Sequence, residues 1–100
     1  MDNMKKAIDD AKKIIENNKK YIFREELLSE LKEGKTDVYL STITSYTRQY
    51  LSNIFKARII IYKETAIKIL KPIFAESVKL KEKYEKYGMD KMVDYFFREI

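Results

Sequence analysis

The chain has 100 residues, of which 37% are charged and 45% hydrophobic, with no cysteine and no histidine. This length supports one domain, residues 1–100, with a single modest core. The lack of Cys and His excludes disulfides, thiol chemistry, ordinary zinc sites and the commonest general base. Two Gly and one Pro leave few places to turn, which argues against an all-β sandwich and predicts an all-α fold, a small bundle of four to five helices.

The net charge of +5 is concentrated in the middle of the chain. Residues 1–34 carry eight cations and eight anions, and residues 72–100 carry six of each. Residues 35–71 carry seven cations against Asp37 and Glu64 alone. A basic central element points to a local contact with an acidic partner or a nucleic acid, rather than to a diffuse polyanion affinity.

The amino-terminal region is charged and lacks a secretory signal, and no run approaches the ~20 apolar residues of a membrane-spanning helix. We therefore expect a soluble, cytoplasmic protein without a membrane contact. The prevalence of Lys and Glu with a single Gln is typical of a thermophilic, for example archaeal, host.

Residues 5–25 repeat every seven residues as KKAIDDA, KKIIENN and KKYIFRE. Ile8, Ile15 and Ile22 share one heptad position, which is typical of a narrow helix seam. We predict a helix over residues 4–33, with a possible break around 18–23. Gly34 is a natural stop, and Thr36 or Asp37 can cap the next helix.

Residues 37–71 predict one long central helix, around which the bundle would pack. Apolar residues fall on a broad stripe at 3.6 residues per turn, and no Gly, Pro or Asx turn pair interrupts the segment. The β-branched residues, Ile59 to Ile61 among them, would also suit strands, so a strand at 57–62 stays open.

Pro72 should kink or end this helix. Residues 73–87 predict a further helix that Gly88 stops. A short final helix follows, with an i, i+3, i+4 apolar face. That face is formed by Met89, Met92, Val93, Phe96, Phe97 and Ile100.

Four cations would share one face of the long helix, namely Arg48, Lys56, Lys63 and Lys71. At about 100° per residue they lie within an arc of about 140°, and Ile60 and Ile67 fall on the same face. Such a mixed surface could bind a phosphate backbone or a partner protein. The alternative is an ordinary solvated helix face, although such faces normally interleave both charges.

Arg58 would lie on the apolar stripe itself. Because a buried guanidinium needs a partner, we expect it to meet a carboxylate or helix-end carbonyls, or to extend to an edge of the stripe. The partner would be in another subunit or would be internal, for example Glu26, Glu30 or Asp94.

Catalytic parts are missing from the sequence. The acidic pairs Asp9/Asp10 and Glu25/Glu26 diverge by about 100° on a helix, and no His can activate a Ser or Thr nucleophile. No Gly-rich phosphate loop is present. We therefore expect a non-enzymatic protein without a cofactor or a metal.

Residues 50–70, YLSNIFKARIIIYKETAIKIL, resemble the long helix in the A-domain of the GINS replication factors. Ile54, Lys56 and Arg58 match its Ile-x-Lys-x-Arg-like core, and Tyr39-Leu40 match the Tyr-Leu stretch before it. The resemblance covers residues 1–70 at most and lacks the β-rich B-domain of that family. It implies a non-catalytic scaffold that joins other subunits in DNA replication.

A second resemblance is to ribbon-helix-helix DNA-binding dimers, with residues 57–62 as the ribbon. The spacing to Gly88 is longer than that fold normally uses. Two hypotheses follow: a helical protein-interaction module of a nucleic-acid-processing assembly, or a small basic DNA-binding homodimer of viral or plasmid type.

Overall fold

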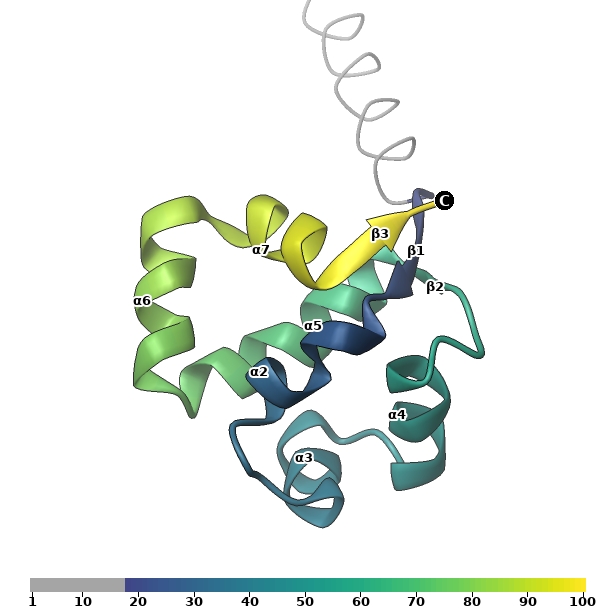
Figure 1. Ribbon diagram of the computed structural model, residues 1–100, viewed down its shortest axis with the longest axis horizontal. Helices are drawn as coiled ribbons and strands as arrows, with labels where there is room; N and C mark the ends of the chain where they lie inside the picture. The colour runs from purple at the N-terminus through teal and green to yellow at the C-terminus, as the bar shows by residue number, and fades with distance from the viewer. Residues whose placement is uncertain (1–17) are drawn as a thin grey trace, which may run out of the picture.

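The computed structural model describes residues 18–100, and these form a small, mostly helical bundle with a three-stranded sheet at one corner (Figure 1). The predicted helical class is therefore confirmed, whereas the heptad seam at residues 4–17 lies outside the described residues. The helical segments are η1 (Glu25–Leu27), α2 (Leu28–Lys32), α3 (Asp37–Thr44), α4 (Arg48–Phe55), α5 (Lys63–Ala75), α6 (Val78–Tyr87) and α7 (Met89–Phe96). The strands are β1 (Lys20–Phe23), β2 (Ile61–Tyr62) and β3 (Phe97–Glu99).

Residues 20–23 form the central strand, which confirms the possible break around 18–23 in the helix predicted over 4–33 and identifies it as a strand. The sheet order is β2-β1-β3, and both pairings are antiparallel. Tyr21 and Phe23 are buried while Lys20 is exposed and Ile22 is half-buried, which is the two-residue alternation of a strand with one face on the core. After β1 the chain is helical in η1 and α2.

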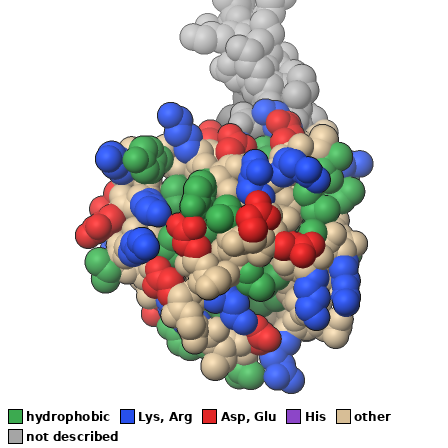
Figure 2. Space-filling view, in the orientation of Figure 1, with side chains coloured by type: hydrophobic (Ala, Val, Ile, Leu, Met, Phe, Trp, Pro, Cys, Tyr) green, Lys and Arg blue, Asp and Glu red, His purple; other side chains and the backbone are tan. Residues whose placement is uncertain are grey.

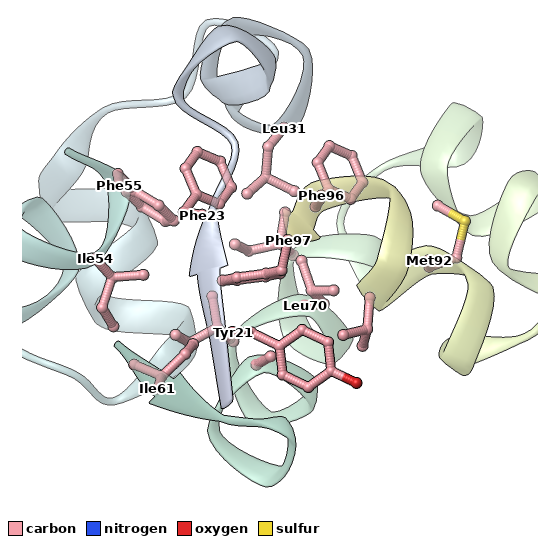
Figure 3. Packing of buried hydrophobic residues seen from close by; sticks show 14 of the residues in the cluster. Tyr21, Phe23, Leu31, Ile54, Phe55, Ile61, Leu70, Met92, Phe96 and Phe97 are labelled. Carbon is pink, nitrogen blue, oxygen red and sulfur yellow. The ribbon is translucent and has the colours of Figure 1, made fainter. Parts of the chain in front are cut away.

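The core lies between the inner face of the sheet and the helices (Figure 3). The Phe23 ring is 5.1 Å from the ring of Phe55 on α4 and 5.3 Å from that of Phe97 on β3. The Phe74 ring on α5 is 6.0 Å from that of Phe96 on α7. Aromatic contacts therefore join the sheet to α4, and α5 to α7.

Residues 37–71 do not form one long helix, which corrects the prediction for this segment. They comprise α3, a turn, α4, a loop, β2 and most of α5. Residues 57–60 are loop and Ile61–Tyr62 are strand. The strand forms because β1 provides a backbone partner, with Lys20 paired with Tyr62 and Tyr21 with Ile61. Local periodicity cannot reveal such a partner. The residues that resemble the GINS helix are therefore divided between α4, the loop, β2 and α5.

In the second half of the chain the helix ends match the prediction with two differences. Pro72 lies inside α5, which continues to Ala75, so the proline does not end the helix. Gly88, at φ +84°, separates α6 from α7 as predicted. The final helix ends at Phe96, and Phe97–Glu99 turn into the edge strand β3.

None of the helices in residues 18–100 combines the length and apolar character that crossing a bilayer requires.

Candidate functional site

The exposed face of α4 carries polar and basic side chains without an acid. At about 100° per residue, the positions on this face fall within an arc of about 140°. Leu51, Ile54 and Phe55 are buried on the opposite side. This outer face is formed by the half-buried Ser52 and Asn53 and the exposed Arg48, Gln49 and Lys56, and we call this set the α4 face.

A three-residue turn, residues 45–47, joins α3 to α4. Ser45 adopts the left-handed conformation at φ +64°, which reverses the chain immediately after α3. The Ser41 hydroxyl donates to the carbonyl of Tyr46 over 2.6 Å, and the Thr47 Oγ1 accepts from the amide of Tyr50 over 3.1 Å. Two eight-residue helices are thus joined by a three-residue turn, which is the connectivity of a helix-turn-helix unit.

The first turn of α3 borders the α4 face. A shallow depression of about 430 Å³ is lined by Asp37 of α3 together with Arg48, Gln49 and Ser52. Lys32 Nζ lies 2.5 Å from Asp37 Oδ1. The hydrogen bond and charge of Lys32 lower the pKa of Asp37, and the charges of Arg48 and Lys56 lower it further. Arg48 thus lies beside the amino end of α3, in the same depression as Asp37.

Charges are distributed differently over the two ends of the molecule. Cationic side chains lie over the α4 end in the space-filling view, with a few acidic side chains at their border (Figure 2). Both signs are mixed over α6 and α7, as on an ordinary solvated surface. The α4 face itself holds the cations Arg48 and Lys56 and no acid, and such a local excess of positive charge could attract an anionic ligand.

Within the α4 face, two amide side chains are joined. Gln49 Nε2 donates to Asn53 Oδ1 over 3.3 Å, one helical turn apart. This bond directs the Gln49 amide along the exposed surface of the helix, toward the next turn.

The four predicted cations do not share one surface. Arg48 and Lys56 lie on the α4 face. Lys63 is buried, with 6% of its surface exposed, and its Nζ lies 2.9 Å from Asp90 Oδ1. Lys71 lines a different depression, between α5 and α6. The common face is lost because the chain turns away after α4.

Arg58 is exposed in the loop after α4, so its predicted position on a buried stripe is wrong. Its amide donates to the Asn53 carbonyl over 2.9 Å, and its guanidinium makes no ion pair within residues 18–100. Glu30 is instead bound by Lys83 and Tyr95, and the Asp94 carbonyl accepts from Arg24. Arg58 is thus a free cation close to the carboxyl end of α4.

The two isoleucines predicted beside the cations also separate. Ile67 is half-buried and packs against the core. Ile60 is 52% exposed, next to Tyr62 at 50%, and both line a depression of about 190 Å³ with Lys20 and Ile61. The Ile100 amide donates to the Lys20 carbonyl, and Ile100 is 63% exposed. The exposed side chains of Ile60, Tyr62 and Ile100 therefore lie on the outer, solvent side of the sheet.

Gln49, Ser52 and Asn53 were not predicted as site residues. The lack of acids over residues 48–56 could have revealed them, together with two possible threonine N-caps, Thr36 and Thr47, eleven residues apart. Residues 18–100 hold no group of three or more acidic side chains that could bind a metal ion. Comparisons with protein-family models, curated proteins and solved structures gave no match for this chain.

Proposed function

We propose that this chain binds duplex DNA through α3 and α4, with α4 in the major groove. The observation that carries the proposal is the α4 face, where Arg, Gln, Ser, Asn and Lys project from one side of a helix free of acids. These are the side chains that form hydrogen bonds with base edges and phosphates. In helix-turn-helix proteins the second helix occupies the major groove while the first crosses the backbone.

Shape favours DNA over duplex RNA. The B-form major groove is about 12 Å wide and admits an α-helix. The A-form major groove is deep and narrow, and side chains do not read it. A protein that recognises base edges through one face of a helix should therefore prefer duplex DNA to duplex RNA of the same sequence.

The cations around α4 supply the phosphate contacts. Lys56 ends the helix and Arg58 follows it in the loop, and both are exposed. Each phosphate contact contributes about −0.9 to the slope of log affinity against log salt concentration. If these two cations bind phosphates, removing either one should make the slope shallower by about 0.9.

Fluorescence anisotropy with a labelled 20-base-pair DNA over a series of salt concentrations tests this function. The variants Lys56→Ala and Arg58→Ala should weaken binding and flatten the slope, while Lys81→Ala, which removes an exposed cation on α6, should leave both unchanged. Equal effects of Lys56→Ala and Lys81→Ala would show that the binding depends only on the overall positive charge. A lack of salt-dependent binding, or a preference for duplex RNA, would end the proposal.

A protein-interaction role is the second candidate function, and the outer side of the sheet is the observation that favours it. Ile60, Tyr62 and Ile100 are at least half exposed there, which is unusual for neighbouring apolar side chains on a monomer surface. The partner that fits the DNA-binding proposal is a second copy of this chain, because helix-turn-helix proteins commonly bind paired half-sites as two-fold dimers.

Sedimentation at increasing concentration tests the self-association. We expect Ile60→Lys to yield monomers under conditions where the wild type dimerises. The matched control is Val78→Lys, at an exposed apolar position on α6, which should behave as the wild type. A wild-type protein that stays monomeric at all concentrations, with and without DNA, excludes the dimer.

A further inference from the structure

The hydrogen bond between Gln49 and Asn53 has a chemical consequence for recognition. Gln49 Nε2 carries two hydrogens, and one of them is donated to Asn53 Oδ1. The other hydrogen and the Oε1 acceptor stay available at the exposed surface of the helix. The planar amide thus offers one donor and one acceptor side by side, with its orientation held from the next turn of α4.

Adenine is the base whose major-groove edge matches this pair. It presents an acceptor at N7 beside a donor at N6, whereas guanine presents two acceptors. Thymine presents an acceptor and a methyl group, and cytosine presents a donor. An amide held in this orientation can form two hydrogen bonds with adenine, and a mismatched edge would leave at least one of its groups unpaired.

We propose that α4 reads an adenine through Gln49, with Asn53 as the residue that positions the Gln49 amide. This inference rests on the proposed function, because it requires α4 to lie in the major groove of duplex DNA. Its ligand is a duplex site with an A·T pair at a fixed position. On the same face Lys56 contacts a phosphate, and Arg48 and Ser52 contact neighbouring bases or phosphates.

Two other roles of a residue on the α4 face can be distinguished from recognition of a base. A phosphate contact would weaken binding equally for all sequences. A residue that only stabilises the helix would change the melting temperature and not the base preference. Substitution of Lys56, on the same helix, therefore provides the control for a contact without sequence information.

Selection from a random duplex library gives the base preference of each variant. The wild type should enrich an adenine at one position, with a discrimination of about 5- to 140-fold over other bases, the equivalent of about 1–3 kcal/mol. Gln49→Glu should change the preference at that position to cytosine, because a carboxylate accepts from cytosine N4. Gln49→Ala should remove the preference there.

Two further variants test the positioning role of Asn53. Asn53→Asp retains the acceptor that holds Gln49 and should keep the adenine preference, although the added negative charge weakens binding at every sequence. Asn53→Ala removes the acceptor and should reduce the adenine preference. Lys56→Ala should weaken binding uniformly and leave the preference intact. Circular dichroism melting of each variant shows whether it is folded.

Two failures are distinguishable. Salt-dependent binding to duplex DNA with a base preference that Gln49→Glu does not change overturns the adenine assignment and leaves the DNA-binding function standing. A folded wild type that binds no duplex at all overturns both. If Asn53→Asp and Asn53→Ala show the same adenine preference, Asn53 does not position the Gln49 amide.

Discussion

Replacing Thr47 with alanine should destabilise the domain more than the same change at Thr36. Both threonines accept a hydrogen bond at a helix amino terminus, from Tyr50 and Tyr39 respectively, and both bonds are 3.1 Å long. Both residues are exposed, so neither substitution removes buried apolar surface. The two sites thus form a matched pair for the energy of an N-cap.

The difference between them lies in the first helical turn. In α3 this turn holds Asp37, whose negative charge also stabilises the positive end of the helix dipole. In α4 it holds no acid and begins with Arg48, so Thr47 provides the side-chain stabilisation of that end alone. An N-cap substitution costs about 0.5–2 kcal/mol, and we expect about 1.5 kcal/mol at Thr47 against about 0.7 kcal/mol at Thr36.

Thermal melting followed by circular dichroism measures the effect. For a domain of this size 1 kcal/mol shifts Tm by about 4–8 °C, so Thr47→Ala should lower Tm by about 6–12 °C. Thr47→Ser keeps the acceptor and should melt close to the wild type. If Thr47→Ala melts with Thr47→Ser, or if the two alanine variants lose equal stability, the account of the α4 amino terminus is wrong.

Three further predictions concern the Glu30 carboxylate, the Asp37 charge and the backbone conformation of Ala57. Tyr95 and Lys83 bind the Glu30 carboxylate, and with the Tyr95 bond as the largest cause they lower the pKa of Glu30 below 4.5. Because this pKa is lower in the folded state, the stabilisation is complete above pH 4.5 and is lost as the pH falls through the lowered value. The difference in urea stability between the wild type and Glu30→Gln should therefore shrink from pH 7 to pH 3, and a constant difference would contradict it. Asp37→Asn removes a negative charge beside Arg48 and Lys56, and should raise affinity for duplex DNA by about 2- to 5-fold at low salt, with no gain at high salt; unchanged anisotropy titrations at low salt would show that Asp37 does not face the ligand. Ala57 adopts φ +56°, so Ala57→Gly should raise the free energy of unfolding by about 0.5–1 kcal/mol in urea titrations, and a loss of stability would refute the strain.

Local punctuation was predictable from the sequence. Thr36 caps α3 and Gly88 separates the last two helices, as their residue types indicate. Part of the apolar face of the final helix was also predictable, since Met92, Val93 and Phe96 are all buried. Phe97 and Ile100, predicted on the same face, lie instead in β3 and at its exposed end. In each confirmed case the information lies within four residues along the chain.

The division of residues 37–71 was not predictable from periodicity. Ser45 takes the left-handed conformation without being a glycine, so the lack of Gly did not mean the lack of a turn. The strand at Ile61–Tyr62 depends on pairing with residues 20–21, and the burial of Lys63 is accompanied by an ion pair with Asp90. These are contacts between distant segments, which a local pattern does not encode.

The same limit applied to the candidate site. Arg48 and Lys56 were identified by charge alone, and they do lie on the α4 face. In the sequence, Gln49, Ser52 and Asn53 are ordinary polar residues. The structure places them beside those two cations, because α4 ends at Phe55. Only the three-dimensional arrangement separates them from Lys63 and Lys71.

The position of β1 at the centre of the sheet determines the order in which the domain can form. Its two neighbours are β2, from the middle of the chain, and β3, at residues 97–99. The sheet therefore closes contacts over nearly the whole described length, and such distant pairings slow folding relative to a bundle held by local contacts. During synthesis β1 must wait for Phe97–Glu99, so the helix-turn-helix unit emerges before the sheet that supports it is complete.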